Sequence, residues 1–253
     1  MITLPIAATL GAAVLATSFI SGIFGMAGGM ILIGILLAIM PVAGAMVLHG
    51  LTQIASNGWR AWLWRAHIRW PLVARHATGS ALATLAFSLL QVAPSKPVAL
   101  IGLGVISLAG LCVPHRIAPN ITRPADAFAC GAICTVLQLI AGVSGPIFDV
   151  FFVRAELARK DVVATKAAIQ VFGHAMKVAY FAQLLAAASG EIAPMAVALA
   201  MTLALAGTQL SRKVLDAITD AQFRSWTRVL IGIIATFYLA HGTLLLLPDM
   251  YGT

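Results

Sequence analysis

One stretch of the sequence decides the fold, and it reads Ser21-Gly22-Ile23-Phe24-Gly25-Met26-Ala27-Gly28-Gly29. It interrupts an apolar run, and a second stretch does the same later in the chain: Ile140-Ala141-Gly142-Val143-Ser144-Gly145-Pro146. Glycine and proline are the residues least favourable inside a helix, so clusters of them mark helix ends. The sequence therefore predicts two broken helices within apolar surroundings.

The composition around these breaks is that of a membrane protein. Of the 253 residues, 61% are hydrophobic and only 9% are Asp, Glu, Lys or Arg, whereas roughly a quarter are charged in an average soluble domain. A helix that crosses the hydrocarbon core of a bilayer needs about 20 mainly apolar residues. Such stretches follow one another almost from end to end, which predicts an all-α, polytopic helical membrane protein.

Apolar segments fall into two sets separated by a polar, proline-containing stretch. The first set covers residues 4–24, 28–40, 43–64, 71–91 and 97–113, and the second covers 125–142, 146–153, 162–185, 192–210 and 227–247. We therefore expect a first membrane repeat over 1–113, a cytoplasmic linker over 114–124 and a second membrane repeat over 125–253.

The two sets have matching features, which indicates an internal repeat. In each set the segment after the break has about 12 residues or fewer, too short to cross a core about 30 Å thick at 1.5 Å per residue. Aligning Gly29 with Gly145 gives an offset of 116, whereas the following helices align at 117, so we expect one inserted residue. At that second offset Gln53, Asn57 and Arg60 fall on Gln170, His174 and Lys177, and each trio lies on one helix face.

The positions of lysine and arginine predict how the two repeats are oriented. Cytoplasmic ends of membrane helices carry an excess of these residues. If segment 43–64 ends in the cytoplasm, only Lys96 lies on the outer side, and Lys166 and Lys177 lie within segment 162–185. Segments 43–64 and 162–185 then run in opposite directions, which predicts two inverted repeats, each with a half-helix hairpin. The basic residues at cytoplasmic ends or loops are Arg60, Arg65, Arg69, Arg75, Arg116, Arg123, Arg154, Arg159, Lys160, Arg212, Lys213, Arg224 and Arg228.

The glycine breaks are the first candidate for a binding site. Irregular backbone at membrane depth is tolerated only where it is buried in protein or lines a wet cavity. The half-helices after the breaks would direct backbone N–H groups and positive dipole ends toward the interior, which suits an anion. We therefore predict substrate contacts at Gly28, Gly29 and Gly145; the alternative is that these glycines only allow close helix packing.

Polar side chains inside the predicted helices extend this candidate site. Inverted symmetry would bring Gln53 and Gln170 together at the middle of the membrane, and we predict that both bind the substrate, with Asn57 and His174 one turn further along. The alternative for these side chains is hydrogen bonding between helices. For His174, a buried neutral histidine is an equally open alternative.

Charged side chains within the predicted membrane segments need compensation. A charge at the centre of a membrane helix costs about 2.5–3.5 kcal/mol on insertion scales, so Lys177 is predicted to bind the anion. Asp149 is the clear acid within a segment, and it is expected to pair with a lysine; the alternatives are that it is protonated or takes part in proton coupling. Lys166 is a candidate for the same coupling or ion pairing. His49 is a further candidate for coupling or ion pairing.

The first break, from Phe19 to Gly29, its degenerate copy at 141–146 and the surrounding hydropathy resemble the TauE/SafE family of sulfite exporter-like permeases. The resemblance covers nearly the whole chain. It implies a two-repeat helical fold in the bacterial inner membrane and transport of sulfite, thiosulfate or an organosulfonate such as sulfoacetate. The chain departs from a full Gly-x-Gly-Gly-Gly pattern in both breaks, which leaves the substrate open.

Together these features predict a secondary transporter, an exporter that alternates its access around a site between the repeats. A permease or channel for a cation or another small solute is the alternative, although a cation pathway normally has several acids. An enzyme is not expected, because no His-Glu-x-x-His or Gly-x-Ser-x-Gly motif is present. We expect no cofactor, no metal and no nucleic-acid partner, since the net charge of +8 is spread over short loops; the apolar surface is compatible with a homodimer.

Overall fold

The computed structural model describes residues 4–217 and 219–251, and no strand occurs within these residues. The all-α fold predicted from the sequence is therefore confirmed. In chain order the elements are α1 (Leu4–Phe24), α2 (Ala27–Ile39), α3 (Val42–Leu63), η1 (Arg65–His67), α4 (Trp70–Leu90), α5 (Lys96–Cys112), η2 (His115–Ile117), α6 (Pro124–Ala141), α7 (Gly145–Phe152), α8 (Arg159–Ala187), α9 (Pro194–Leu210), α10 (Arg212–Ala217) and α11 (Asp220–Tyr251).

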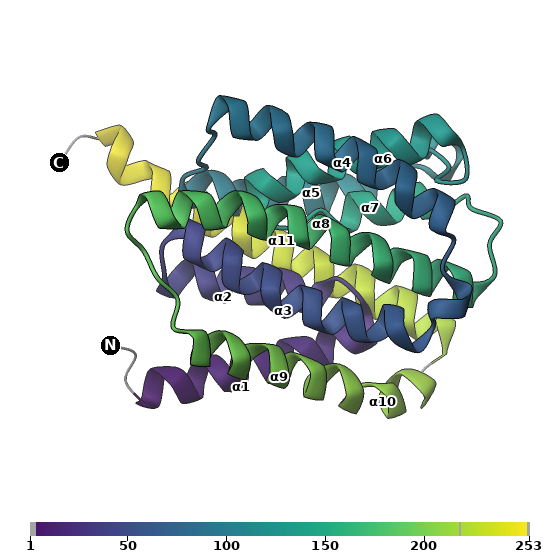
Figure 1. The fold of residues 1–253 in the computed structure, drawn as a ribbon, viewed down its shortest axis with the longest axis horizontal. Coiled ribbons are helices and arrows are strands. Elements are labelled where there is room, and N and C mark those ends of the chain that lie inside the picture. The colour runs from purple at the N-terminus through teal and green to yellow at the C-terminus, as the bar shows by residue number, and fades with distance from the viewer. Residues whose placement is uncertain (1–3, 218, 252–253) are drawn as a thin grey trace.

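The long helices run side by side across the molecule, with α1 beginning and α11 ending at the left of Figure 1. Helix α3 packs mainly on α8 at the centre, and α5 packs on α11. On the outside, α1 packs on α9 and α4 packs on α6. The short helices α2 and α7 are enclosed by these longer ones, and their buried residues include Met30, Leu36 and Phe148.

Close contacts at glycines fix the relative directions of the two central pairs. A Cβ atom on Gly50 of α3 would lie 3.4 Å from Lys177 Cε, and one on Gly58 would lie 3.9 Å from Val171 Cγ2. Residue numbers thus rise along α3 as they fall along α8, so the two helices are antiparallel. Helices α5 and α11 are antiparallel by the same reasoning, because Gly104 faces Ala235 while Gly242 faces Ile101.

The predicted segments and the observed helices differ mainly at polar ends. Helix α2 has 13 residues and α7 has eight, so both are short. Helix α8 begins at Arg159 and α11 extends over 220–251, several residues beyond the predicted segments. Hydropathy detects only the apolar part of a helix, and the polar turns that continue it give no signal. For the same reason the short, charged helix α10 was not predicted.

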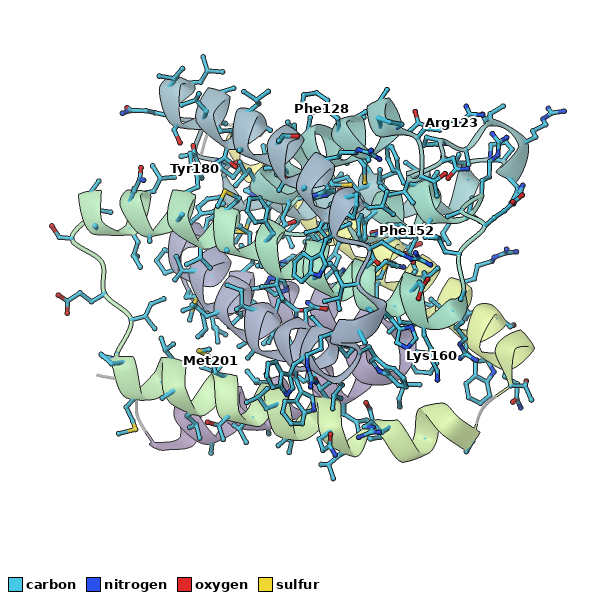
Figure 2. The ribbon with its side chains drawn as sticks, turned by 45° about the vertical axis from the view of Figure 1, so that its right-hand side comes forward. Arg123, Phe128, Phe152, Lys160, Tyr180 and Met201 are labelled. Carbon is cyan, nitrogen blue, oxygen red and sulfur yellow. The ribbon has the colours of Figure 1, made fainter. Side chains whose placement is uncertain are left out.

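The outer surface of the bundle is rich in exposed apolar side chains. Leu89 on α4, Met195 on α9 and Phe237 on α11 are 76%, 78% and 62% exposed, and Phe128 projects outward in Figure 2. A soluble monomer rarely exposes so much apolar surface. Two helices, Pro124–Ala141 and Ser225–Leu247, are long and apolar enough to cross a membrane by length and composition, and shorter apolar helices cover Ala8–Phe24, Ala27–Ile39, Lys96–Cys112 and Pro194–Leu210.

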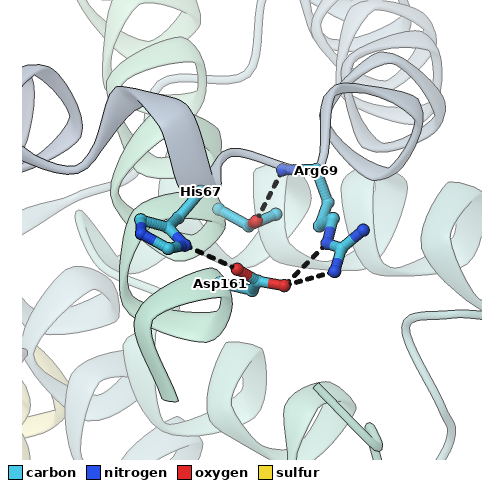
Figure 3. Close-up of polar contacts among 4 residues, drawn as sticks. His67, Arg69 and Asp161 are labelled. Atoms are coloured by element: carbon cyan, nitrogen blue, oxygen red, sulfur yellow. Dashed lines mark hydrogen bonds and ion pairs between the residues drawn. The ribbon is translucent and has the colours of Figure 1, made fainter. Parts of the chain in front are cut away.

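A polar cluster fastens the loop between α3 and α4 to the start of α8 (Figure 3). Asp161, in the first turn of α8, accepts hydrogen bonds from Arg69 Nε at 2.8 Å and from His67 Nδ1 at 3.0 Å. The backbone N–H of Arg69 donates to Thr165 Oγ1 at 3.0 Å. The Arg69 guanidinium, together with His67, holds the pKa of the Asp161 carboxyl below its ordinary value. The loop is therefore held by the ionised form of Asp161.

We expect Asp161→Asn to lower the melting temperature of the purified protein in detergent at neutral pH. Because the folded state binds the ionised carboxylate, this stabilisation is present at neutral pH and disappears as the pH falls through the lowered pKa of Asp161. The melting temperatures of wild type and variant should therefore converge in acid. Glu156→Gln, at an exposed acid in the preceding loop, is the control and should match wild type throughout; a gap between Asp161→Asn and wild type that persists in acid would contradict the assignment.

Candidate functional site

The two glycine breaks meet inside the bundle. In each break one glycine has a positive φ, 69° at Gly25 and 84° at Gly142, a conformation that glycine adopts without strain. A Cβ atom on Gly145 would lie 2.6 Å from Met26 Cβ, so the second break is in direct contact with the first. The left-handed glycines are 117 residues apart, the offset that also aligns the following helices. At an offset of 117, Gly28 rather than Gly29 matches Gly145.

A narrow cavity of about 30 Å³ lies where the breaks meet. Three glutamines and two histidines are among its polar lining residues, and no carboxylate is among the residues that line it. From the first half of the chain it is lined by Met26, Gly29, His49 and Gln53, and from the second half by Gln138, Val143, Ser144, Gly145, Gln170 and His174.

Six of the residues singled out from the sequence line this cavity. They are Gly29, His49, Gln53, Gly145, Gln170 and His174. Gln53 and Gln170, on the antiparallel helices α3 and α8, line the same cavity. Gly29 leaves room for Gln53, because a Cβ atom on Gly29 would lie 3.3 Å from Gln53 Nε2.

Three other predicted substrate contacts lie outside the cavity lining. Gly28 faces α1, where an added Cβ atom would lie 2.8 Å from Ser21 Cβ, so this glycine serves helix packing. Asn57 donates from Nδ2 to the Gln53 carbonyl at 2.9 Å, and its buried Oδ1 has no hydrogen-bond partner. Lys177 is fully buried behind His49.

Lys177 is held by hydrogen bonds rather than by an acid. Its Nζ donates to His49 Nδ1 at 2.7 Å and to the carbonyl oxygen of Gly142 at 2.9 Å. His49 Nε2 in turn donates to the carbonyl oxygen of Gly29 at 2.9 Å. This chain of contacts joins α8, α3, α2 and the second break, so it links both halves of the molecule at the cavity.

Asp149 and Lys166 form an ion pair with each other on the other side of the second break. The Lys166 ammonium also lies 5.7 Å from the ring centre of Phe148 and 5.6 Å from that of Phe152, within the range of cation–π attraction. Asp149 therefore has its charge compensated by Lys166 and makes no contact with Lys177.

A larger cavity of about 230 Å³ adjoins the second break. Met26 lines this cavity as well as the narrow one, so the two spaces are neighbours. Asp149 of α7 and Arg228 of α11 contribute its charged groups. Its lining residues are Met26, Gly110, Leu111, Pro146, Asp149, Thr227, Arg228 and Ile231.

Gln138 is the main polar residue that the sequence analysis missed. Its Nε2 donates to His174 Nδ1 at 3.0 Å, and its side chain is buried beside Gly173, where an added Cβ atom would lie 3.3 Å from Gln138 Oε1. The ring centres of His174 and His49 are 5.6 Å apart. The sequence did contain a signal for Gln138. This residue lies four positions before Gly142, just as the polar residue Ser21 lies four positions before Gly25.

A comparison with known protein families identifies the family of this chain. The sequence model of the family described as Sulfite exporter TauE/SafE matches residues 10–238. The chain belongs to this family. The match includes both breaks and every cavity-lining residue, and it confirms the resemblance noted from the sequence. Searches of curated proteins and of solved structures find no match.

Membership of TauE/SafE shows that the chain is a membrane-embedded protein of a transporter family. Its apolar outer surface and helical architecture agree with that setting. The narrow cavity offers amide N–H donors, imidazoles and the nearby Lys177 ammonium. Among residues 4–217 and 219–251 no group of three or more histidine, cysteine or acidic side chains is placed to hold a metal ion.

The neighbouring glycines of the first break should respond differently to the same substitution. Gly28→Ala would force a Cβ atom into the backbone of α1, and we expect it to destabilise the protein by about 1–3 kcal/mol or more. Gly29→Ala would press only on the movable end of Gln53, so the protein should fold with reduced transport.

Melting temperature in detergent and flux in proteoliposomes measure the two effects separately. Gly232→Ala is the control, because an added Cβ atom there meets no atom within 4 Å. Normal stability of Gly28→Ala would contradict the packing role of Gly28, and normal flux through Gly29→Ala would contradict the role of the cavity.

Proposed function

We propose that this TauE/SafE protein exports a small sulfur-containing anion, such as sulfite, thiosulfate or a sulfoacetate-like organosulfonate, across the bacterial inner membrane. The observation that carries the proposal is the narrow cavity between the two breaks. Its lining combines three glutamine side chains, two histidines and the first turn of α7, without an acid.

The chemistry of this lining suits an oxyanion. Amide N–H groups donate to anionic oxygens without bringing a charge, and the free N–H groups at a helix N-terminus favour negative charge. Lys177 lies one hydrogen bond behind His49 and adds positive charge when it is protonated. The acid Asp149 is paired with Lys166 and so adds little net negative charge to the region. These features favour an anion over a cation.

We further propose that the chain is a multi-pass protein of two inverted repeats, over 1–113 and 125–253, joined by a linker. Several observations support this arrangement. The corresponding helices α3 and α8 are antiparallel, and so are α5 and α11. The pair α1–α9 corresponds to the pair α6–α4, and both are packed pairs. Inverted repeats generate two alternating states when one repeat adopts the conformation of the other.

The sizes of the two cavities suggest how access alternates. A space of about 30 Å³ is roughly that of two or three water-sized probes, so the region around Gln53 and Gln170 is closed in this conformation. The larger cavity lies on the side of the helix ends that carry Arg228, which the positive-inside rule assigns to the cytoplasm. We propose that an anion enters there and passes Met26 to reach the glutamines.

Transport of the anion should depend on both glutamines. In proteoliposomes loaded with sulfite, thiosulfate or sulfoacetate, we expect Gln53→Ala and Gln170→Ala to raise the half-saturating concentration about tenfold or more. The reason is that a hydrogen bond to a charged group contributes about 1.5–3 kcal/mol, and 1.4 kcal/mol corresponds to a factor of ten.

Gln183→Ala, at an exposed glutamine toward the far end of the same helix α8, is the matched control and should behave as wild type. The same proteoliposomes are tested with a divalent cation. Cation flux without flux of any of the three anions would overturn the proposal in favour of a cation permease.

The inverted topology has its own test by cysteine labelling. Cys112 is exposed and is first replaced by serine, whereas Cys130 and Cys134 are buried. Lys96→Cys and Arg159→Cys are then made singly in that background and treated on intact cells with a membrane-impermeant maleimide. We expect labelling of the first from the outer side and of the second only after the inner side is exposed; labelling of both from the same side would rule out this topology.

A further inference from the structure

Lys177 and His49 form a buried pair, and no acidic side chain among residues 4–217 and 219–251 is bonded to either of them. Both residues are fully buried, and among the described residues Lys177 Nζ makes hydrogen bonds only to His49 Nδ1 and to the carbonyl oxygen of Gly142. A charge inside a membrane protein is costly unless it is paired or solvated, and such residues are therefore associated with transport and proton relays. The pair needs a compensating charge whenever it holds a proton.

The hydrogen bonds define where the protons lie. The Gly29 carbonyl can only accept, so His49 carries a hydrogen on Nε2. The lone pair of His49 Nδ1 is then free to accept from Lys177 Nζ at 2.7 Å. His49 lines the narrow cavity and Lys177 lies behind it. A proton can thus move from Lys177 to the cavity wall across one short hydrogen bond.

Within the described residues no carboxylate is bonded to the pair, because the acids on the surrounding elements have other partners. Asp161 of α8 accepts from Arg69 and His67, and Asp126 of α6 accepts from the backbone N–H of Asn120. Also on α8, the ring centre of His174 lies 5.6 Å from that of His49, and Tyr180 donates to the Val92 carbonyl. On α3, Arg60 is about three turns from His49 and donates to Ser56 Oγ at 3.5 Å. Helices α2 and α9 have no titratable side chain, and on α4 His76 bonds Ser80. On α7, Asp149 is bound to Lys166, so an anion in the cavity is the available counter-charge.

We propose that Lys177 and His49 bind a proton that is carried together with the anion, which makes this protein a proton–anion cotransporter; the inference rests on the proposed anion transport. When the anion enters, the pair gains one proton from water. The N–H bond on Lys177 Nζ then breaks as one forms on His49 Nδ1, which leaves a neutral amine and an imidazolium facing the anion. When the anion leaves, the proton leaves with it, and the empty site is neutral.

The test measures net thiosulfate flux and proton movement in the same proteoliposomes. These contain the full chain and a pH-sensitive dye. Thiosulfate is the probe, because it is fully ionised near neutral pH, whereas sulfite itself exchanges protons with water in that range. Valinomycin and equal potassium on both sides remove charge imbalance. We expect a thiosulfate gradient to move protons in the same direction as the anion, and an imposed pH gradient to drive thiosulfate uphill.

Two variants separate coupling from folding. Lys177→Met should reduce proton movement more than tenfold per thiosulfate transported, and His49→Gln should do the same while keeping an N–H donor for the Gly29 carbonyl. Because Lys177 is fully buried, both variants are checked for a monodisperse profile in detergent, and His49→Gln decides if Lys177→Met does not fold. Lys96→Met, outside the bundle core at the start of α5, is the matched lysine control and should remain coupled.

The outcomes distinguish the two proposals. Net thiosulfate flux by wild type without proton movement would overturn the cotransport inference and leave anion transport standing. Folded variants that move as many protons per anion as wild type would have the same consequence. If wild type transports none of thiosulfate, sulfite and sulfoacetate, the proposed anion transport on which the inference rests is overturned.

Discussion

Lipid offers no hydrogen bonds to a broken helix, and the interior of this protein is organised around that constraint. Each break contains a glycine with a positive φ angle, and in both cases the carbonyl oxygen of this glycine accepts a hydrogen bond from a side chain. The Ser21 hydroxyl donates to the Gly25 carbonyl, and the Lys177 ammonium donates to the Gly142 carbonyl. Tyr238 of α11 adds a further bond, from its hydroxyl to the Met30 carbonyl at 2.7 Å. The polar residues at the centre are thus required by the backbone as well as by any substrate.

The same constraint explains why both halves of the chain meet at one place. Broken backbone is stable at membrane depth when protein encloses it, and here each break encloses the other through the contact of Met26 with Gly145. The antiparallel helices α3 and α8 cross beside this contact and bring Gln53 and Gln170 to it. A polar cavity at the junction is then a consequence of the fold, and the absence of acids from its lining is what favours the proposed anion.

Much of this arrangement could be predicted from the sequence, because the informative signals were local. Apolar length, glycine clusters and the i, i+4, i+7 spacing of polar residues predicted the helices, both breaks and six residues of the cavity lining. Gln138 was missed because its partner, His174, lies 36 residues away. Lys177 was assigned to the substrate, although its hydrogen bonds to His49 and Gly142 depend on how three separate segments pack. Gly28 and Gly29 are adjacent in sequence, yet only the packed structure shows that one faces α1 and the other faces Gln53.

Met26 lines both the narrow and the larger cavity, and this position has an electrical consequence. Water conducts and packed side chains do not, so a voltage across the membrane falls mainly over the dry part of the pathway. The larger cavity of about 230 Å³ brings open space up to Met26 on one side, whereas the region around Gln53 and Gln170 is closed. Water in the larger cavity would leave a dry path shorter than the roughly 30 Å of the bilayer core. The field, about 2.3 kcal/mol per charge for a full 100 mV, would then act mainly on the part of the substrate's path that begins at Met26.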